Sequence, residues 1–276
     1  MTLQQVLPLL LYLPEDSTLK LPKIPWNTEI SPLGIPRFKE GGSEAVLLIH
    51  GFRGLTQEFY YLFDRISEEG YTVSLPRLPG HGTNAADFHA SNGSDWLRKV
   101  TDEYLLLKTT HDKVHIAGLS MGGLLTLILA QEFTPDSICL MAPAISIRHK
   151  LIHHIHFLKY IKPYANGEWD EEKENDPLRK ALGREYWAKT DTWKLADMMK
   201  LRKRALENLS RVESRTLTIV SEGDKTVAPD AVEIISNGIS SKNIEHLILE
   251  KSSHVLVNGC EKEEVADRLI EWLKQE

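Results

Sequence analysis

A serine flanked by glycines, between a predicted strand and a predicted helix, is the feature that most limits how this chain can fold. Gly118-Leu119-Ser120-Met121-Gly122 follows Val114–Ala117, an apolar run typical of a buried strand. Residues 123–133 after it are apolar nearly all round, as in a buried helix. A serine on such a strand-to-helix turn has a strained backbone and a hydroxyl that points away from the sheet, so Ser120 is a candidate nucleophile.

A serine hydroxyl is a weak nucleophile at neutral pH, so Ser120 would need a base and an acid that orients the base. In folds built around this turn, the chain order is serine, then Asp or Glu, then histidine. A predicted strand over 215–221 is followed by Asp224, and a predicted strand over 244–250 is followed by His254. At the carboxyl edge of a parallel sheet, Asp224 would orient His254, and His254 would take the proton from Ser120.

Two other acids compete with Asp224 for this role. Glu222 lies nearer the strand end, and Asp230 is the expected N-cap of a helix over 231–239. Gly223 gives Asp224 the freer loop geometry. An Asp after a strand is more often a turn or cap residue, and a loop histidine is more often solvated than catalytic. The occurrence of both at strand ends, in the required order, favours the triad.

Negative charge develops on the substrate oxygen during acyl transfer, and backbone N–H groups that face it are commonly the largest catalytic term. One donor would be Met121, the residue after the candidate nucleophile. The other would come from the loop His50-Gly51-Phe52-Arg53-Gly54, which follows a predicted strand over 45–49. Its glycines let the backbone turn close to a substrate, which points to the N–H of Phe52. His50 is also consistent with a simple turn in which its ring bonds to the backbone.

Taken together, these motifs resemble the α/β-hydrolase superfamily and, within it, the small bacterial carboxylesterases and monoacylglycerol lipases. The similarity runs from about Glu44 to Leu273, apart from a poorly matched middle. The motifs that carry it are His50-Gly51-Phe52, Leu78-Pro79-Gly80-His81-Gly82, Gly118-Leu119-Ser120-Met121-Gly122-Gly123, Gly223-Asp224 and Ser253-His254-Val255.

The resemblance implies Ser120 as nucleophile, Asp224 as acid and His254 as base, with Phe52 and Met121 as oxyanion donors. The sequence departs from the family at the residue before the catalytic histidine, which is commonly glycine and here is serine. We expect little effect of this change, since the serine hydroxyl could hydrogen-bond within the loop.

Alternating strands and helices predict a mostly parallel, doubly wound sheet that binds ligands at its carboxyl edge, and the resemblance implies that this is the α/β-hydrolase fold. Further expected elements are a strand over 71–75 and helices over 56–69, 95–111 and 261–275. The core is expected over residues 37–142 and 213–276.

The alternation stops between residues 143 and 212, where no strand-like run occurs but 178–182 and 193–206 have helical patterns. Residues 143–212 are therefore expected to form a helical cap, inserted after the strand ending at Ala142. Apolar side chains would suit its inner face to an acyl chain, although most of them could serve only to join cap and core. They are Trp169, Tyr186, Trp187, Trp193, Met198 and Met199. The acidic run 170–176 is expected to be a solvated face or loop.

Residues 1–36 hold six of the 13 prolines and are expected to form an extended arm over the core. The apolar run 6–13 has no Lys or Arg before it and no small-residue cleavage site after it, which favours a cytoplasmic enzyme over an exported one. It is shorter than the roughly 18 apolar residues of a membrane span, so no stable membrane insertion is expected. The arm is either a surface segment or an apolar cover for the active-site mouth or for a partner protomer in a homodimer.

The net charge, the cysteines and the histidines limit which kinds of ligand and partner are expected. A net charge of −6 argues against a nucleic-acid surface. Cys139 and Cys260 fit reduced thiols better than a disulfide framework. His149 and His153 stand four residues apart, as zinc ligands can, with His154 and His156 after them, but no third ligand presents itself. No metal and no cofactor are expected, and the partner is a small-molecule ester substrate.

The residues and the resemblance predict a serine carboxylic-ester hydrolase for short- to medium-chain acyl esters or monoacylglycerols, acting through an acyl-enzyme intermediate. A thioesterase, a carbon–carbon bond hydrolase or a perhydrolase on the same Ser-Asp-His scaffold stays open. Ser120 excludes the haloalkane dehalogenase and epoxide hydrolase subtypes, which need a carboxylate at that position. A binding protein that kept the scaffold and lost the chemistry would lack a triad member, and none is missing.

Overall fold

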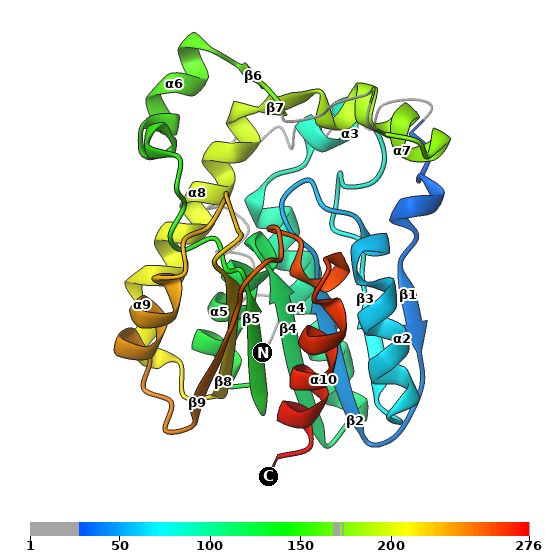
Figure 1. The fold of residues 1–276 in the computed structure, drawn as a ribbon, viewed down its shortest axis with the longest axis vertical. Helices are drawn as coiled ribbons and strands as arrows, with labels where there is room; N and C mark the ends of the chain where they lie inside the picture. Colours follow the sequence, from blue (N-terminus) through cyan, green and yellow to red (C-terminus); the bar gives the residue numbers. More distant parts are fainter. Residues whose placement is uncertain (1–27, 168–171, 173, 276) are drawn as a thin grey trace, which may run out of the picture.

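A seven-stranded sheet forms the centre of the computed structural model, which describes residues 28–167, 172 and 174–275 (Figure 1). The strand order is β1-β3-β2-β4-β5-β8-β9, and every neighbouring pair is parallel except β1 with β3. The strands are β1 (Arg37–Lys39), β2 (Glu44–Ile49), β3 (Thr72–Leu75), β4 (Lys113–Leu119), β5 (Ser137–Met141), β8 (Arg215–Ser221) and β9 (Ile244–Leu249). The mostly parallel sheet of the expected fold class is confirmed.

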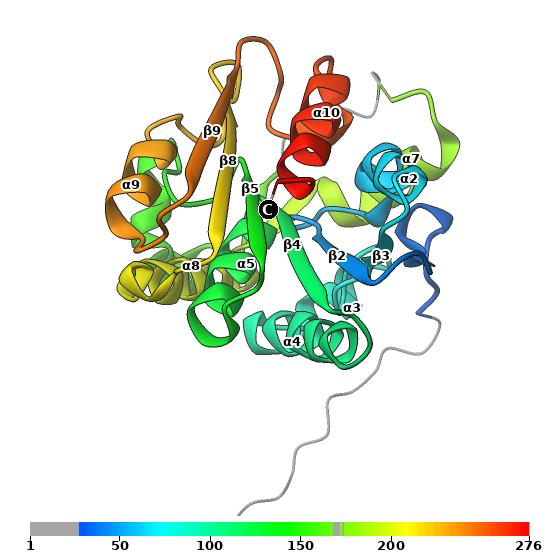
Figure 2. The same cartoon turned by 90° about the horizontal axis from the view of Figure 1, so that it is seen from below.

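Helices cover both faces of this sheet (Figure 2). The described helices are α2 (Tyr60–Glu68), α3 (Ala85–Ala90), α4 (Gly93–Thr110), α5 (Met121–Phe133), α6 (Ile155–Ile161), α7 (Pro177–Leu182), α8 (Thr192–Glu207), α9 (Ala231–Gly238) and α10 (Lys262–Leu273). Of these, α3, α6 and α7 lie above the carboxyl ends of the strands rather than on a face of the sheet (Figure 1). Shorter helical turns are η1 (Pro32–Gly34), η2 (Thr56–Phe59), η3 (Lys150–His154), η5 (Gly183–Trp187), η6 (Leu209–Arg211) and η7 (Leu256–Asn258).

The pleat of each strand sends alternate side chains to opposite faces, and β2 shows this clearly. Ala45, Leu47 and Ile49 pack in the core layer that contains α4, α5, α8 and α9. Val46 and Leu48 pack in the layer that contains α2 and α10. Both faces of the strand are therefore buried, and its sequence is continuously apolar rather than alternating.

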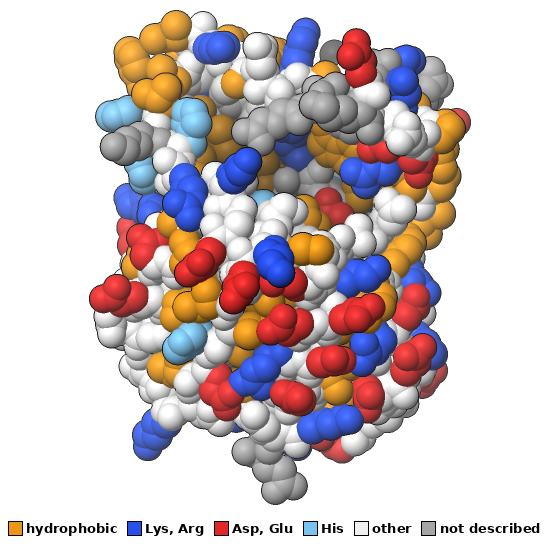
Figure 3. Space-filling model, viewed as in Figure 1, with side chains coloured by type: hydrophobic (Ala, Val, Ile, Leu, Met, Phe, Trp, Pro, Cys, Tyr) orange, Lys and Arg blue, Asp and Glu red, His pale blue; other side chains and the backbone are white. Residues whose placement is uncertain are grey.

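The segment between β5 and β8 lies above the carboxyl ends of the strands (Figure 1). Figure 3 shows that the surface is hollowed between this segment and the sheet below it. The expectation that no strand occurs here was wrong, because β6 (Tyr164–Asn166) and β7 (Lys189–Asp191) form a two-stranded antiparallel sheet. Strands of three residues are too short to show the alternating pattern by which strands are recognised in a sequence.

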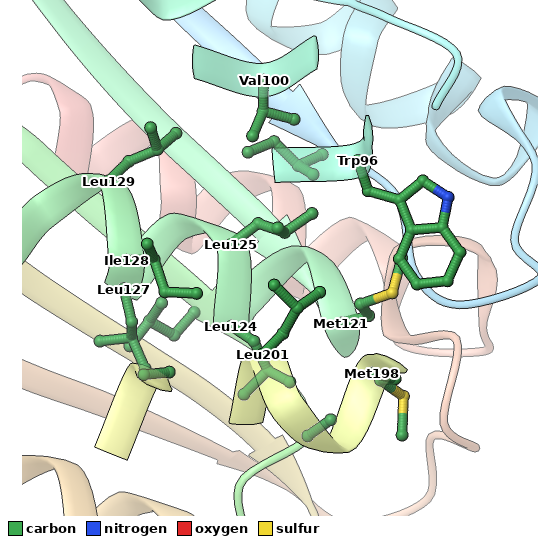
Figure 4. Close-up of a cluster of buried hydrophobic side chains, with 14 of the residues drawn as sticks. Trp96, Val100, Met121, Leu124, Leu125, Leu127, Ile128, Leu129, Met198 and Leu201 are labelled. Atoms are coloured by element: carbon green, nitrogen blue, oxygen red, sulfur yellow. The ribbon is translucent and has the colours of Figure 1, made fainter. Parts of the chain in front are cut away.

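α8, the last α-helix between β5 and β8, packs like a core helix. α5 is apolar nearly all round because the sheet, α4 and α8 enclose it, and Met198 and Leu201 of α8 lie in the same apolar cluster as Met121 and Leu124 (Figure 4). The division of residues 143–212 from the core as a cap thus remains a proposal, with α8 shared between the two.

The structure also bears on several smaller predictions from the sequence. β1 and α3 were not predicted, and both are short. Asp230 stands at the N-cap of α9, but its side chain makes no capping hydrogen bond. Trp169 and the first 27 residues of the expected arm lie outside the described residues. Both cysteines are free, Cys139 buried and Cys260 exposed. Among the described helices, none is both long enough and apolar enough to cross a membrane.

Candidate active site

Ser120 stands between β4 and α5 in a backbone conformation that a residue with a side chain rarely adopts, with φ 56° and ψ −112°. Hydrogen bonds hold it there: its N–H donates to Met141 O at 2.9 Å, and its carbonyl oxygen accepts the N–H of Gly123 at 3.0 Å and of Ala144 at 3.1 Å. A Cβ at Gly118 would come within 2.3 Å of the Gly122 carbonyl oxygen, so the turn can close only around glycine.

Three predicted residues meet at the carboxyl edge of the sheet. The Oγ of Ser120 lies 2.9 Å from Nε2 of His254, and Nδ1 of His254 lies 2.7 Å from Oδ2 of Asp224. Ser120 is 8% exposed and Asp224 is 2% exposed. With Nδ1–H donating to the carboxylate, Nε2 is left as an acceptor for the serine proton.

The structure distinguishes Asp224 from its two rivals. The side chains of Glu222 and Asp230 are exposed, whereas that of Asp224 is buried beside the imidazole. Gly223 has its role here: a Cβ at this position would lie 2.8 Å from Lys251 O, so only glycine lets the loops after β8 and β9 come together.

The carboxylate of Asp224 is stabilised in its charged form. Burial alone raises its pKa, but hydrogen bonds from His254 and from the N–H groups of Thr226 (2.7 Å) and Val227 (3.1 Å) outweigh burial, so the pKa lies below its usual value. Arg148 also donates to the carbonyl oxygen of Asp224 at 2.9 Å. The acid is thus held both by its side chain and by its backbone.

The loop that carries His254 is fixed by Glu261, a residue that the sequence did not single out. Its carboxylate accepts the N–H of Ser252 and the Ser252 hydroxyl, both at 2.6 Å, and the N–H of Lys251 at 3.1 Å. Ser253, the departure from the family pattern, is exposed, and no hydrogen bond of its hydroxyl is seen among the described residues. The hydroxyl that stabilises this loop belongs to Ser252.

His50 holds the predicted oxyanion loop from within the core. It is fully buried; its Nδ1 lies 3.0 Å from Gly51 O, and its Nε2 accepts the N–H of Leu78 at 3.1 Å. The interpretation of His50 as a backbone-bonded turn residue is therefore confirmed. These bonds also tie the loop after β2 to the Leu78–Gly82 motif, since both histidine nitrogens are used.

The loop after β2 runs directly beside the candidate nucleophile. A Cβ at Gly51 would lie 3.3 Å from Cβ of Ser120. Within the described part of the chain, the N–H groups of Phe52 and Met121 have no hydrogen-bond partner. Met121 is the first residue of α5, where helix N–H groups lack an internal acceptor and the helix dipole favours negative charge.

A second carboxyl group near the site was also missed from sequence. Glu58, in η2, interacts electrostatically with His254 and with Arg179. Burial raises the pKa of Glu58 to about 7, against smaller opposing effects of the Leu55 backbone, Arg179 and His254. No sequence pattern marks it, because η2 approaches His254 only through the packing of η2 against η7.

The apolar side chains expected to line the cap have different surroundings. Tyr186 is buried, and its ring packs edge-on against Phe88 at 5.3 Å. Trp187 is half-buried and lies on the same turn. Trp193 is 36% exposed and packs against Tyr160 of α6. Met198 and Met199 are buried with the core, which favours the interpretation that part of this set joins segment to core.

The sequence also offered an acidic run and a group of histidines as candidate charged or metal-binding sites. Of the acidic run 170–176, Glu174 pairs with Arg179 at 2.8 Å, and Asp176 caps α7. His149, His153, His154 and His156 precede or lie within α6. In the described ranges, no group of three or more His, Cys, Asp or Glu residues is arranged to hold a metal ion.

Comparison with known proteins places this geometry in context. Residues 46–268 match the model of the Alpha/beta hydrolase family. The chain is 33% identical over 240 residues to a thermostable monoacylglycerol lipase of Bacillus sp. (strain H-257), covering 86% of this chain and 93% of the relative. It is 26% identical over 237 residues to a carboxylesterase of Bacillus subtilis (strain 168), covering 86% and 94%.

A solved structure from work on two metagenome-derived lipolytic enzymes, LipS and LipT, has the same fold. It superimposes with a TM-score of 0.81 at 28% sequence identity, over 90% of this chain and 100% of the solved one.

Proposed function

The chain belongs to the alpha/beta hydrolase family, and on that premise we propose that it is a serine ester hydrolase with Ser120 as nucleophile, His254 as base and Asp224 as acid. The observation that carries the proposal is the 2.9 Å distance between Ser120 Oγ and His254 Nε2, on a histidine whose Nδ1 faces a buried carboxylate. Relatives named as a monoacylglycerol lipase and a carboxylesterase, similar over most of both chains, support ester hydrolysis as the reaction.

Acylation begins when Ser120 Oγ attacks the ester carbonyl carbon and its proton passes to Nε2 of His254. Asp224 stabilises the imidazolium that forms, because its carboxylate is held ionised. The new oxyanion accepts hydrogen bonds from the N–H groups of Phe52 and Met121. The ester C–O bond then breaks, His254 returns the proton to the departing alcohol, and the acyl group stays on Ser120.

Deacylation repeats these steps with water. His254 takes a proton from the water molecule as its oxygen attacks the acyl carbon, and the bond to Ser120 Oγ breaks. His254 protonates Oγ as the carboxylic acid leaves. No metal or cofactor enters either half of this cycle.

We expect the substrates to be short- to medium-chain acyl esters or monoacylglycerols. Support comes from the apolar side chains of the cap segment, among them Tyr186 and Trp187, which lie above the carboxyl edge of the sheet, and from the names of the relatives. The finer expectations of a cytoplasmic location and a homodimer are likewise proposals. Cell fractionation and sedimentation of the purified protein test these two.

The decisive experiment is covalent labelling combined with turnover. The purified protein is treated with a fluorophosphonate, digested and analysed by mass spectrometry, and assayed on p-nitrophenyl butyrate and on a matched butyryl thioester. We expect one adduct on Ser120, loss of activity in step with labelling, and preference for the oxygen ester. Absence of labelling would contradict the mechanism, and a strong preference for the thioester would favour the thioesterase alternative.

A further inference from the structure

The loop with the proposed oxyanion donor Phe52 contains a second residue in an unusual conformation. Arg53 follows Phe52 with a positive φ of 58°, a region that favours glycine. The loop closes behind it through a hydrogen bond from Gly54 N–H to Gly51 O at 3.0 Å. Other contacts must hold an arginine in this conformation.

Those contacts come from a segment more than 130 residues further along the chain. Arg53 donates from Nη2 to Tyr186 O at 3.0 Å and from Nη1 to Thr190 Oγ1 at 2.5 Å. In return, Nε1 of Trp187 donates to Arg53 O at 3.0 Å. Both the side chain and the carbonyl group of Arg53 are thus bound to η5 and β7, in the segment above the sheet.

The guanidinium makes these bonds without a carboxylate partner. Burial lowers the pKa of Arg53, and within the described residues no acid lies at ion-pair distance from it. A buried cation that has only neutral partners gains little from charge pairing. Arg53 is therefore better suited to hold the loop in position than to neutralise a charge.

The Phe52 side chain reaches the same segment by a second route. Its ring packs edge-on against Phe88 at 5.4 Å and Trp96 at 6.0 Å. Phe88 in turn packs edge-on against the Tyr186 ring at 5.3 Å. Phe52 is therefore held by aromatic contacts on its side chain and, through Arg53, by hydrogen bonds on the next residue of the backbone.

We propose that Arg53 is a positioning residue that, through Tyr186, Trp187 and Thr190, aims the N–H of Phe52 at the oxyanion. The inference rests on the proposed function. If Arg53 has this role, the alignment of the Phe52 N–H depends on the position of η5 and β7. Because the oxyanion forms only in the transition state, loss of this alignment lowers kcat and leaves KM nearly unchanged.

The test compares R53Q, R53K and W187F with the wild type on p-nitrophenyl butyrate. W187F keeps an aromatic ring and removes the Nε1 donor to Arg53 O. The matched control is R202Q, since Arg202 also donates from a partly buried guanidinium to a backbone carbonyl, Ile145 O at 2.6 Å, but does not touch the loop. Melting temperatures of all four variants establish that they are folded.

For R53Q we expect kcat to fall by about 10- to 100-fold, somewhat less than for removal of a whole oxyanion donor, with KM within about twofold. R53K should recover part of the loss, W187F should show a smaller loss of the same kind, and R202Q should match the wild type. If R53Q does not fold, W187F and R53K carry the test.

A transition-state analogue supplies a second readout. An alkylboronic acid adds Ser120 Oγ to boron, the serine proton goes to His254, and the tetrahedral boronate places an oxygen where the oxyanion forms. Its inhibition constant should rise in R53Q by the same factor as kcat/KM falls. An increase in KM at unchanged kcat, or an equal loss in R202Q, would overturn the role of Arg53. A wild type that neither hydrolyses esters nor reacts with the fluorophosphonate would instead overturn the proposed function.

Discussion

Gly122 lies so close to Ile49 that a Cβ atom on it would come within 2.1 Å of the Ile49 carbonyl oxygen. This contact joins the first turn of α5 to the end of β2. It allows Ser120 and the loop after β2 to lie side by side, since a side chain at position 122 would clash with the end of β2.

Replacement of Gly122 by alanine should therefore destabilise the fold. Backbone atoms cannot move away as a side chain can, so we expect a loss of at least about 1–3 kcal/mol in the free energy of unfolding, as for an overpacked core. G93A is the control, because a Cβ at Gly93 meets only ordinary contacts at 3.5 Å. Urea denaturation of both variants measures the difference, and equal midpoints would refute the argument.

The triad predicts a graded loss of activity. S120A should lower kcat by on the order of 10⁶, since only binding and the oxyanion donors remain, and H254A should fall nearly as far. D224N should lose less. E222Q is the matched control, because Glu222 follows the same strand and its side chain is exposed. The assignment of the acid is wrong if E222Q loses more activity than D224N at equal folded fraction.

Glu58 should influence the pH dependence of catalysis. Burial raises its pKa to about 7, so its carboxyl group ionises near neutral pH, where it interacts with His254. An ionised carboxylate favours the protonated imidazole, whereas the reaction needs the neutral form. In E58Q the acidic limb of the kcat/KM profile should therefore move to lower pH, with a similar plateau. A shift to higher pH, or no shift, would contradict this coupling.

His50 should make the protein acid-sensitive. Burial lowers its pKa to about 4, although the bond with Gly51 opposes this, whereas the unfolded chain titrates near 6.5. Between these values the unfolded state binds the extra proton, so stability falls as the pH falls, by roughly 3 kcal/mol in all. H50Q should lose less stability than the wild type between pH 7 and 4. The exposed H156Q should follow the wild type, and parallel curves for all three would exclude this source.

Acyl length should control activity until the pocket is full. Each buried methylene is worth about 0.8 kcal/mol, so two more carbons could raise kcat/KM by roughly tenfold. A p-nitrophenyl series from acetate to palmitate should rise and then fall, and long-chain triglycerides should be poor substrates. Flat activity across the series would contradict an apolar acyl pocket.

Local pattern alone was enough to predict most of the core. Apolar runs marked β2, β4 and β5 to within two residues, because strands that are buried on both faces have few polar residues. The turn at Ser120 and the polar residues after β8 and β9 could be located for a similar reason. Parallel strands end at one edge, so their following residues, Asp224 and His254, had to approach each other.

Only the tertiary structure shows the contacts between residues that are far apart in the sequence. Asp224 and Glu222 are both acids after the same strand, and only the contact of the loops at Gly223 and Lys251 turns one of them toward the imidazole. Glu261 holds the histidine loop from nine residues beyond Ser252, and Arg53 meets Tyr186 from the opposite half of the chain. Periodicity and turn chemistry depend on near neighbours in sequence, whereas these contacts exist only once the sheet has brought distant loops to one edge.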